Sequence, residues 1–204
     1  MGILEDYASL GYAVVDDFLP YEGALKLNAL YTAEQNWEQQ DQMRETHYQH
    51  VFKTKATCFP REDEQYMAKF GRSKTLEQSA VFMDTYTEVV MPAIEKAVSI
   101  RLRECDVRCY RLLAGDFYRT HIDDYAGDVG LIYYINKNWV WDWGGILHIC
   151  HDDETADKSI ASVLPKFNRA VLINHKVFRF PHFISSVEPW AKEPRYGIIA
   201  FNRI

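Results

Sequence analysis

Apolar residues follow helical spacing in the first half of this chain. They recur every three or four positions over 21–36 and again over 73–101, which predicts two helices. Pro92 falls inside the second helix and is expected to kink or divide it, because proline lacks a backbone donor. A short strand is expected over 11–19, ahead of the first helix.

Residues 37–60 are polar and poorly periodic, which predicts loops with one short strand near 50–53. Beyond residue 104 the pattern changes to short apolar or alternating runs bounded by Gly, Asn, Asp or Pro. The expected strands are 107–113, 117–123, 129–135, 145–150, 170–175, 178–184 and 196–201.

This number and spacing of strands predicts a sandwich or a jelly-roll barrel. No Pro/Gly/Ser linker separates the halves, so we expect a single domain over 1–204. In this α+β, mainly β arrangement, residues 1–103 form helical support and residues 104–204 form the barrel.

Composition narrows the function classes. The chain has 204 residues, 48% of them hydrophobic, and a formal net charge of −6. That hydrophobic content predicts a folded protein, and the negative charge argues against a nucleic-acid or membrane-surface partner. There is no signal-peptide pattern, no long apolar run and no CxxC pair, so we expect a cytoplasmic protein with reduced cysteines.

His121 and Asp123 are the most informative residues for chemistry. On a strand, residues two apart point to the same face, so both side chains could bind one metal ion. A third histidine would complete a two-His, one-carboxylate set, which leaves open positions and is typical of non-haem iron(II) oxygenases. The candidates are His148, His151, His175 and His182. We prefer His182, although spacing alone leaves the choice between His175 and His182 nearly even.

Arg195 begins an apolar strand, which would place its guanidinium inside the barrel. An unpaired charge there is unfavourable, so a bound dicarboxylate would supply the missing partner. Tyr134 and Tyr110 are candidate hydroxyl donors to the same carboxylate. Gly144 and Gly145 permit a close backbone approach. They follow a loop containing Trp139, Trp141 and Trp143, which either forms a lid or packs against the helices.

Two other functions compete with an oxygenase. A zinc hydrolase would need three protein ligands, an activated water and a nearby base, but the chain has neither an HExxH motif nor the HxE plus PCxxC pattern of deaminases. The second alternative is a non-catalytic jelly-roll module that binds a ligand or a protein, which fold alone does not exclude.

Taken together, these motifs resemble the iron(II)- and 2-oxoglutarate-dependent dioxygenases, specifically the prolyl 4-hydroxylase-like group that includes the hypoxia-inducible factor prolyl hydroxylases. The segments that carry the resemblance run in the same order over the last half of the chain. They are DFYRTHID at 116–123, LIYYINKNW at 131–139, GGIL at 144–147, PKFNR at 165–169, His182 and RYGI at 195–198.

The resemblance implies a double-stranded β-helix, or cupin-like jelly roll, with iron(II) ligands at His121, Asp123 and His182. It also implies 2-oxoglutarate binding by Arg195 with Tyr134 and Tyr110, O₂ as co-substrate, and ascorbate as a reductant. The expected reaction is hydroxylation of an unactivated C–H bond in a peptidyl proline or similar side chain, with a small-molecule substrate left open. One departure is the spacing from His182 to Arg195, where residues 188–193 look like a short insertion.

Overall fold

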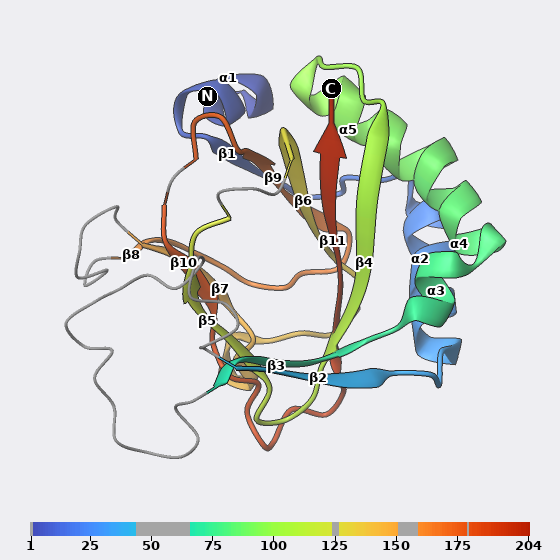
Figure 1. Ribbon diagram of the computed structural model, residues 1–204, viewed down its shortest axis with the longest axis vertical. Coiled ribbons are helices and arrows are strands. Elements are labelled where there is room, and N and C mark those ends of the chain that lie inside the picture. Colours follow the sequence, from blue (N-terminus) through green and yellow to red (C-terminus); the bar gives the residue numbers. More distant parts are fainter. Residues whose placement is uncertain (1, 44–65, 124–126, 151–158, 179) are drawn as a thin grey trace.

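The computed structural model describes residues 2–43, 66–123, 127–150, 159–178 and 180–204 (Figure 1). Its strands form one antiparallel sheet that curls into a nearly closed barrel, in the order β1-β9-β6-β11-β4-β3-β5-β10-β7-β8, with β2 paired to β3. The strands are β1 Tyr12–Val15, β2 Glu38–Met43, β3 Tyr66–Arg72, β4 Glu104–Leu112, β5 Phe117–His121, β6 Val129–Tyr134, β7 Leu147–Cys150, β8 Ser159–Val163, β9 Arg169–Asn174, β10 His182–Ile184 and β11 Arg195–Arg203.

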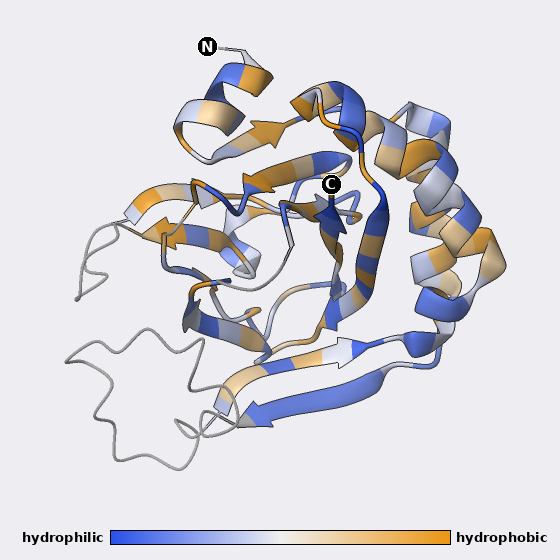
Figure 2. Cartoon of the chain, turned by 45° about the horizontal axis from the view of Figure 1, so that its top comes forward, coloured by the Kyte–Doolittle hydropathy of each residue, from blue (hydrophilic) through white to orange (hydrophobic). Residues whose placement is uncertain are grey.

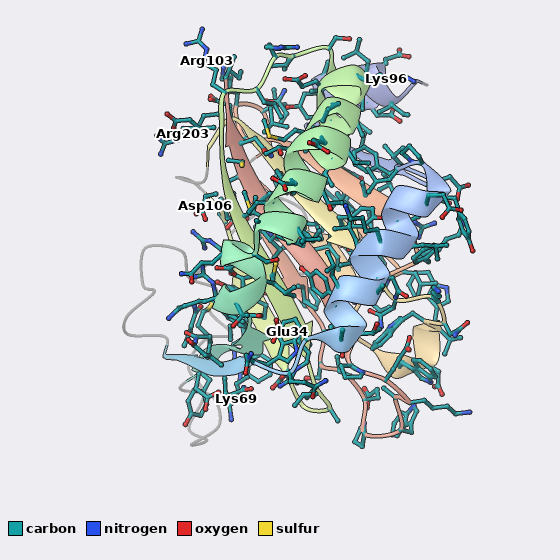
Figure 3. All side chains as sticks on the ribbon, turned by 90° about the vertical axis from the view of Figure 1, so that its right-hand side faces the viewer. Glu34, Lys69, Lys96, Arg103, Asp106 and Arg203 are labelled. Atoms are coloured by element: carbon teal, nitrogen blue, oxygen red, sulfur yellow. The ribbon has the colours of Figure 1, made fainter. Side chains whose placement is uncertain are left out.

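The helices precede most of the barrel in sequence and cover one outer side of it, as the sequence predicted. In Figure 1 the helices of residues 21–98 lie beside β4, whereas the first helix lies beside β1, and Figure 3 shows the two main helical segments next to each other across the sheet. The helices are α1 Ile3–Ser9, α2 Tyr21–Ala33, α3 Lys74–Gln78, α4 Ala80–Thr85, the π-helical turn η4 Tyr86–Val90, α5 Met91–Val98 and the 3₁₀ turn η5 Trp141–Trp143.

Strand alternation divides the apolar side chains of the barrel between two cores. On β11, Ile198 and Ala200 are fully buried against the helices, whereas Ile199 packs in the barrel interior. On β6, Tyr133 faces the helices and Tyr134 faces the interior. Because neighbouring residues on a strand point to opposite faces, one sheet can bury a helical layer outside and enclose a site inside.

The long helical segment over 80–98 contains a π-helical turn, which keeps its buried apolar side chains on one face. Its fully or almost fully buried side chains recur every fourth residue, at Phe82, Tyr86, Val90, Ile94 and Val98. A four-residue repeat is longer than the 3.6 residues of an α-helical turn, so the stripe would drift around a regular helix. The wider turn η4 takes up this excess. The division expected near Pro92 is therefore present, as a π turn followed by α5 with its proline at the start.

Several elements differ from the sequence predictions. The structure has α1, β3 and β8 where no element was expected, and β2 lies in a segment predicted to be loop. Strand β2 is hydrophilic along almost all of its length (Figure 2), so it has no apolar period to detect. The strand expected near 50–53 lies outside the described residues. In the described part of the chain, no helix is both long and apolar enough to cross a membrane.

Ile198→Ala tests the core between the helices and the sheet. Ile198 is 0% exposed, so we expect the truncation to lower the free energy of unfolding by about 2–5 kcal/mol. Urea denaturation followed by circular dichroism measures the change. Ile160→Ala, at a side chain that is 42% exposed, is the control and should change stability by less than about 0.5 kcal/mol. Equal losses in the two variants would contradict this assignment of the core.

Candidate metal centre

His121 and His182 face each other across two neighbouring strands. His121 is the last residue of β5 and His182 is the first residue of β10, and the antiparallel register pairs them directly. Side chains at paired positions of adjacent strands lie on the same face and touch. The two imidazole rings accordingly have centroids 4.3 Å apart, and both residues are buried.

Asp123 lies just beyond the end of β5 and closes this pair into a triangle. Its Oδ1 is 3.6 Å from His121 Nε2, and its Oδ2 is 3.3 Å from His182 Nε2. One ligand atom from each of the three residues lies within 4.8 Å of the others. Three ligands bound at right angles, each at about 2.1 Å, would be about 3 Å apart, so the triangle has the size that a divalent metal ion requires.

The backbone orients both imidazole rings. His121 Nδ1 is 2.8 Å from the carbonyl oxygen of Arg119, and His182 Nδ1 is 3.2 Å from that of Phe180. A carbonyl oxygen only accepts hydrogen bonds, so each Nδ1 carries the hydrogen and donates it. With Nδ1 protonated, Nε2 is the nitrogen left to bind a metal ion beside Asp123, which is the usual outer-shell arrangement of metal-binding histidines.

The electrostatics of the site favour an ionised carboxylate. Burial alone would raise the pKa of Asp123, but the imidazoles of His121 and His182, with a smaller effect from His175, outweigh it and hold that pKa well below its usual range. Burial likewise lowers the pKa of His182, and the neighbouring Asp123 carboxylate more than reverses that effect. A cation bound between these groups would satisfy the carboxylate and leave both imidazoles neutral.

The other candidate histidines are elsewhere. His175 lies on the wall of the adjoining pocket, where its ring packs 5.9 Å from that of Phe201. His148 stacks on Phe183 at 4.6 Å and its Nδ1 is 2.9 Å from the Ser162 hydroxyl. His151 lies outside the described residues. Among the described histidines, only His182 joins His121 and Asp123.

Arg195 supplies a second buried polar centre inside the barrel. The residue is 3% exposed, and its Nε and Nη2 have no hydrogen-bond partner among the described residues. Its guanidinium lies over the ring of Tyr134, 5.2 Å from the centroid, and the buried Tyr134 hydroxyl also lacks a hydrogen-bond partner there. Burial lowers the pKa of Arg195. A buried cation beside an unsatisfied hydroxyl is a site for an anion.

The Gly144-Gly145 pair makes room for this centre. A Cβ atom at Gly145 would lie 2.7 Å from Cδ of Arg195, and one at Gly144 would lie 2.0 Å from the carbonyl oxygen of Ser186. Both glycines also have positive φ angles. The close approach that the sequence suggested is therefore an approach to Arg195 itself and to the segment before it.

A pocket lies beside the triangle of His121, Asp123 and His182 on the inner face of the barrel. Tyr110 lines it, together with two residues that the sequence reasoning did not single out, Arg108 and Tyr118. The Tyr118 ring packs against that of His121, with centroids 4.4 Å apart and the planes tilted by 40°. Strand parity could have found Arg108, because it lies two positions before Tyr110 and so faces the same way.

The tryptophan loop packs on the barrel rather than on the helical layer. Trp139 is 7% exposed, belongs to the interior core and donates its indole N–H to the carbonyl oxygen of Gly144 at 2.9 Å. Trp143 packs edge-on against Trp139, whereas Trp141 is 58% exposed. The loop thus fixes the backbone next to the glycine pair.

The sequence profile of the 2OG-Fe(II) oxygenase superfamily matches residues 105–203, which span β4 to β11 and contain the triangle and Arg195. Residues 105–203 belong to the 2OG-Fe(II) oxygenase superfamily. This membership implies Fe(II), 2-oxoglutarate and O₂ as reactants, and the donor set of the triangle and the unsatisfied Arg195 fit the first two. Comparison with curated proteins gives no match.

Solved structures share the fold of this chain over nearly its whole length. A Pseudomonas putida prolyl-4-hydroxylase is 19% identical, with a TM-score of 0.64 and 98% of this chain and 96% of that chain covered. A Trichoplax adhaerens prolyl hydroxylase in complex with a hypoxia inducible factor peptide fragment is 19% identical, with a TM-score of 0.62 and coverages of 98% and 86%. The α-ketoglutarate-dependent epimerase SnoN of nogalamycin biosynthesis is 11% identical, with a TM-score of 0.62 and coverages of 97% and 79%. The predicted jelly roll of prolyl hydroxylase-like type is confirmed.

Gly145→Ala tests the space that this glycine leaves for Arg195. The matched control is Gly115→Ala, since Gly115 also has a positive φ but no atom within 4 Å of a Cβ built there. Gly115→Ala should lower the free energy of unfolding by about 1–2 kcal/mol, which is the cost of holding a residue other than glycine at a positive φ. Gly145→Ala should lower the free energy of unfolding by at least about 1 kcal/mol more than the control does, because the added methyl group displaces buried atoms. Urea denaturation measures both, and equal losses would show that contact with Arg195 is unimportant.

Proposed function

We propose that this oxygenase hydroxylates an unactivated C–H bond, using His121, Asp123 and His182 to hold Fe(II). The observation that supports this assignment is the convergence of the three ligand atoms within 4.8 Å on the barrel's inner face. These two imidazoles and one carboxylate would hold the ion and leave coordination positions for small reactants.

In this proposal Arg195 and Tyr134 bind the distal carboxylate of 2-oxoglutarate. Their unsatisfied Nε, Nη2 and hydroxyl groups offer the donors that such a carboxylate accepts. Tyr110 lines the metal-side pocket, where its hydroxyl can orient the same co-substrate. The apolar walls of the interior, such as Ile132 and Leu147, exclude water around the reacting atoms.

When bound, Fe(II), 2-oxoglutarate and O₂ supply an oxidant that takes hydrogen from carbon and returns hydroxyl, with succinate and CO₂ as co-products. The protein fixes the geometry of these reactants. We propose a peptidyl proline or a similar side chain as the substrate, because the Trichoplax prolyl hydroxylase of the same fold is in complex with a peptide fragment. Ascorbate as reductant, a cytoplasmic location and a single domain over 1–204 remain predictions.

Asp123→Ala tests the metal assignment. Removing the only carboxylate of the triangle should weaken Fe(II) binding and lower succinate release by more than about 100-fold, because changes to outer-shell partners alone cost 10–100-fold. Titration of the protein with Fe(II) under argon and a succinate assay measure the two effects. Asp84→Ala, on the exposed face of α4, is the control. Full turnover in Asp123→Ala would contradict the assignment, and a wild type without succinate release would favour the binding-module alternative.

Arg195→Met tests the co-substrate site. We expect the KM for 2-oxoglutarate to rise about 10- to 100-fold, which corresponds to about 1.5–3 kcal/mol for a charge-assisted hydrogen bond. The free energy of unfolding of the cofactor-free protein should not fall, because an unpaired buried guanidinium gives way to an apolar side chain. Arg101→Met, at a side chain that is 89% exposed, is the control. An unchanged KM for 2-oxoglutarate would show that Arg195 does not bind this co-substrate.

A further inference from the structure

The pocket that adjoins the metal triangle contains a cation that the proposed reaction does not use. Among the lining residues that the structure describes, Arg108 is the sole lysine or arginine, and Arg195 is not one of them. Most of the other lining side chains are apolar or aromatic, including Ile132, Ile199 and Phe201. The Arg108 side chain is 35% exposed, so its charge is within reach of a ligand that enters this pocket.

Arg108 and Arg195 lie toward opposite ends of the same inner face. In the β4–β11 register, Leu112 pairs with Arg195 and Arg108 pairs with Ile199, four positions farther along β11. At about 3.3 Å per residue, the two positions are about 13 Å apart along the strands. A co-substrate that reaches from Arg195 to the metal ion therefore leaves Arg108 on the other, open side of the pocket.

The charge of Arg108 acts on the pocket tyrosines. The guanidinium lies over the ring of Phe201, 5.0 Å from the centroid. Burial raises the pKa of both Tyr110 and Tyr118, and the charge of Arg108 opposes that rise at each hydroxyl. Tyr118 in turn packs against the ring of His121, so aromatic rings lie between the cation and the metal triangle.

Asp106 is an exchangeable partner for Arg108. Its Oδ2 alone accepts from Nη2 at 2.7 Å and from Nε at 3.2 Å, so the pair lacks the two-oxygen fork that arginine makes with an optimally placed carboxylate. The Asp106 side chain is 54% exposed, and Figure 3 shows it at the edge of the molecule near Arg203, clear of the helices. Water can solvate Asp106 when another anion takes its place, because exposed pairs of this kind contribute only about 0–1 kcal/mol.

We infer that Arg108 binds a carboxylate of the substrate and so selects substrates with an acidic group next to the carbon that is oxidised. This inference rests on the proposed function. The carboxylate can come from a free amino acid or from the C-terminus of a peptide, since both offer the same two oxygens. In either case it displaces Asp106 and lies between Arg108 and the metal triangle.

The experiment compares acids with their amides. The protein is loaded with 2-oxoglutarate and Mn(II), which does not support turnover, and is titrated calorimetrically with the common amino acids, with tripeptides that have free C-termini, and with the amide of each. We expect at least one acid to bind about tenfold or more tightly than its amide. If an amino acid shows this difference, the carboxylate comes from a free amino acid; if a tripeptide shows it, the carboxylate is a peptide C-terminus.

Three variants assign the preference to Arg108. Arg108→Gln should abolish the acid-over-amide difference, and Asp106→Asn should increase it by removing the competing carboxylate. Arg203→Gln is the matched control, because Arg203 lies farther out on the neighbouring strand and its side chain is 69% exposed. It should leave the difference unchanged. In the Fe(II) enzyme, Arg108→Gln should retain the wild-type KM for 2-oxoglutarate.

Other results would overturn the inference. It fails if no acid binds better than its amide, if Arg108→Gln keeps the preference, or if Arg108→Gln raises the KM for 2-oxoglutarate, which would assign the residue to the co-substrate. Failure of the proposed function is distinguishable, because the wild-type protein would then release no succinate from 2-oxoglutarate at all.

Discussion

The antiparallel pairing of β5 with β10 is the contact on which the site depends. It sets His121 opposite His182, and Asp123 follows β5 closely enough to lie against both rings. A shift of one residue in this register would turn one imidazole to the other face of the sheet. The same strands are held on their far sides by β3 and β7, so the barrel as a whole keeps the triangle in place.

The barrel interior contains buried charges that bound ligands of opposite charge would compensate. Arg195 lies in the interior without an ionic partner among the described residues, and Asp123 is ionised next to two imidazoles. Stability alone would favour apolar side chains at such positions. The structure retains two centres of opposite charge on one inner face, which is the arrangement that a metal ion and an organic anion would complete together.

The sequence predicted the second half of the chain better than the first. Strands β4, β6, β9 and β11 are buried on both faces or alternate clearly, so their apolar patterns are strong. Strand β2 consists mostly of polar residues and pairs with β3, and local pattern cannot reveal an element that has no apolar face. Strand β5 ends at His121, two residues earlier than predicted, so Asp123 reaches the triangle from a loop instead of from the strand itself.

By itself the sequence determined the kinds of chemistry available: two imidazoles and a carboxylate for a metal ion, an arginine at the start of an apolar strand, and a glycine pair that permits close approach. These follow from residue type and from strand parity, which are local properties. Only the tertiary structure decided that His182, not His175, joins His121 and Asp123, that Arg195 packs against Gly145, and that Arg108 faces the pocket. The reason is that pairing between distant strands is set by the packing of the whole barrel, and positions of suitable parity exist on several strands until that packing selects among them.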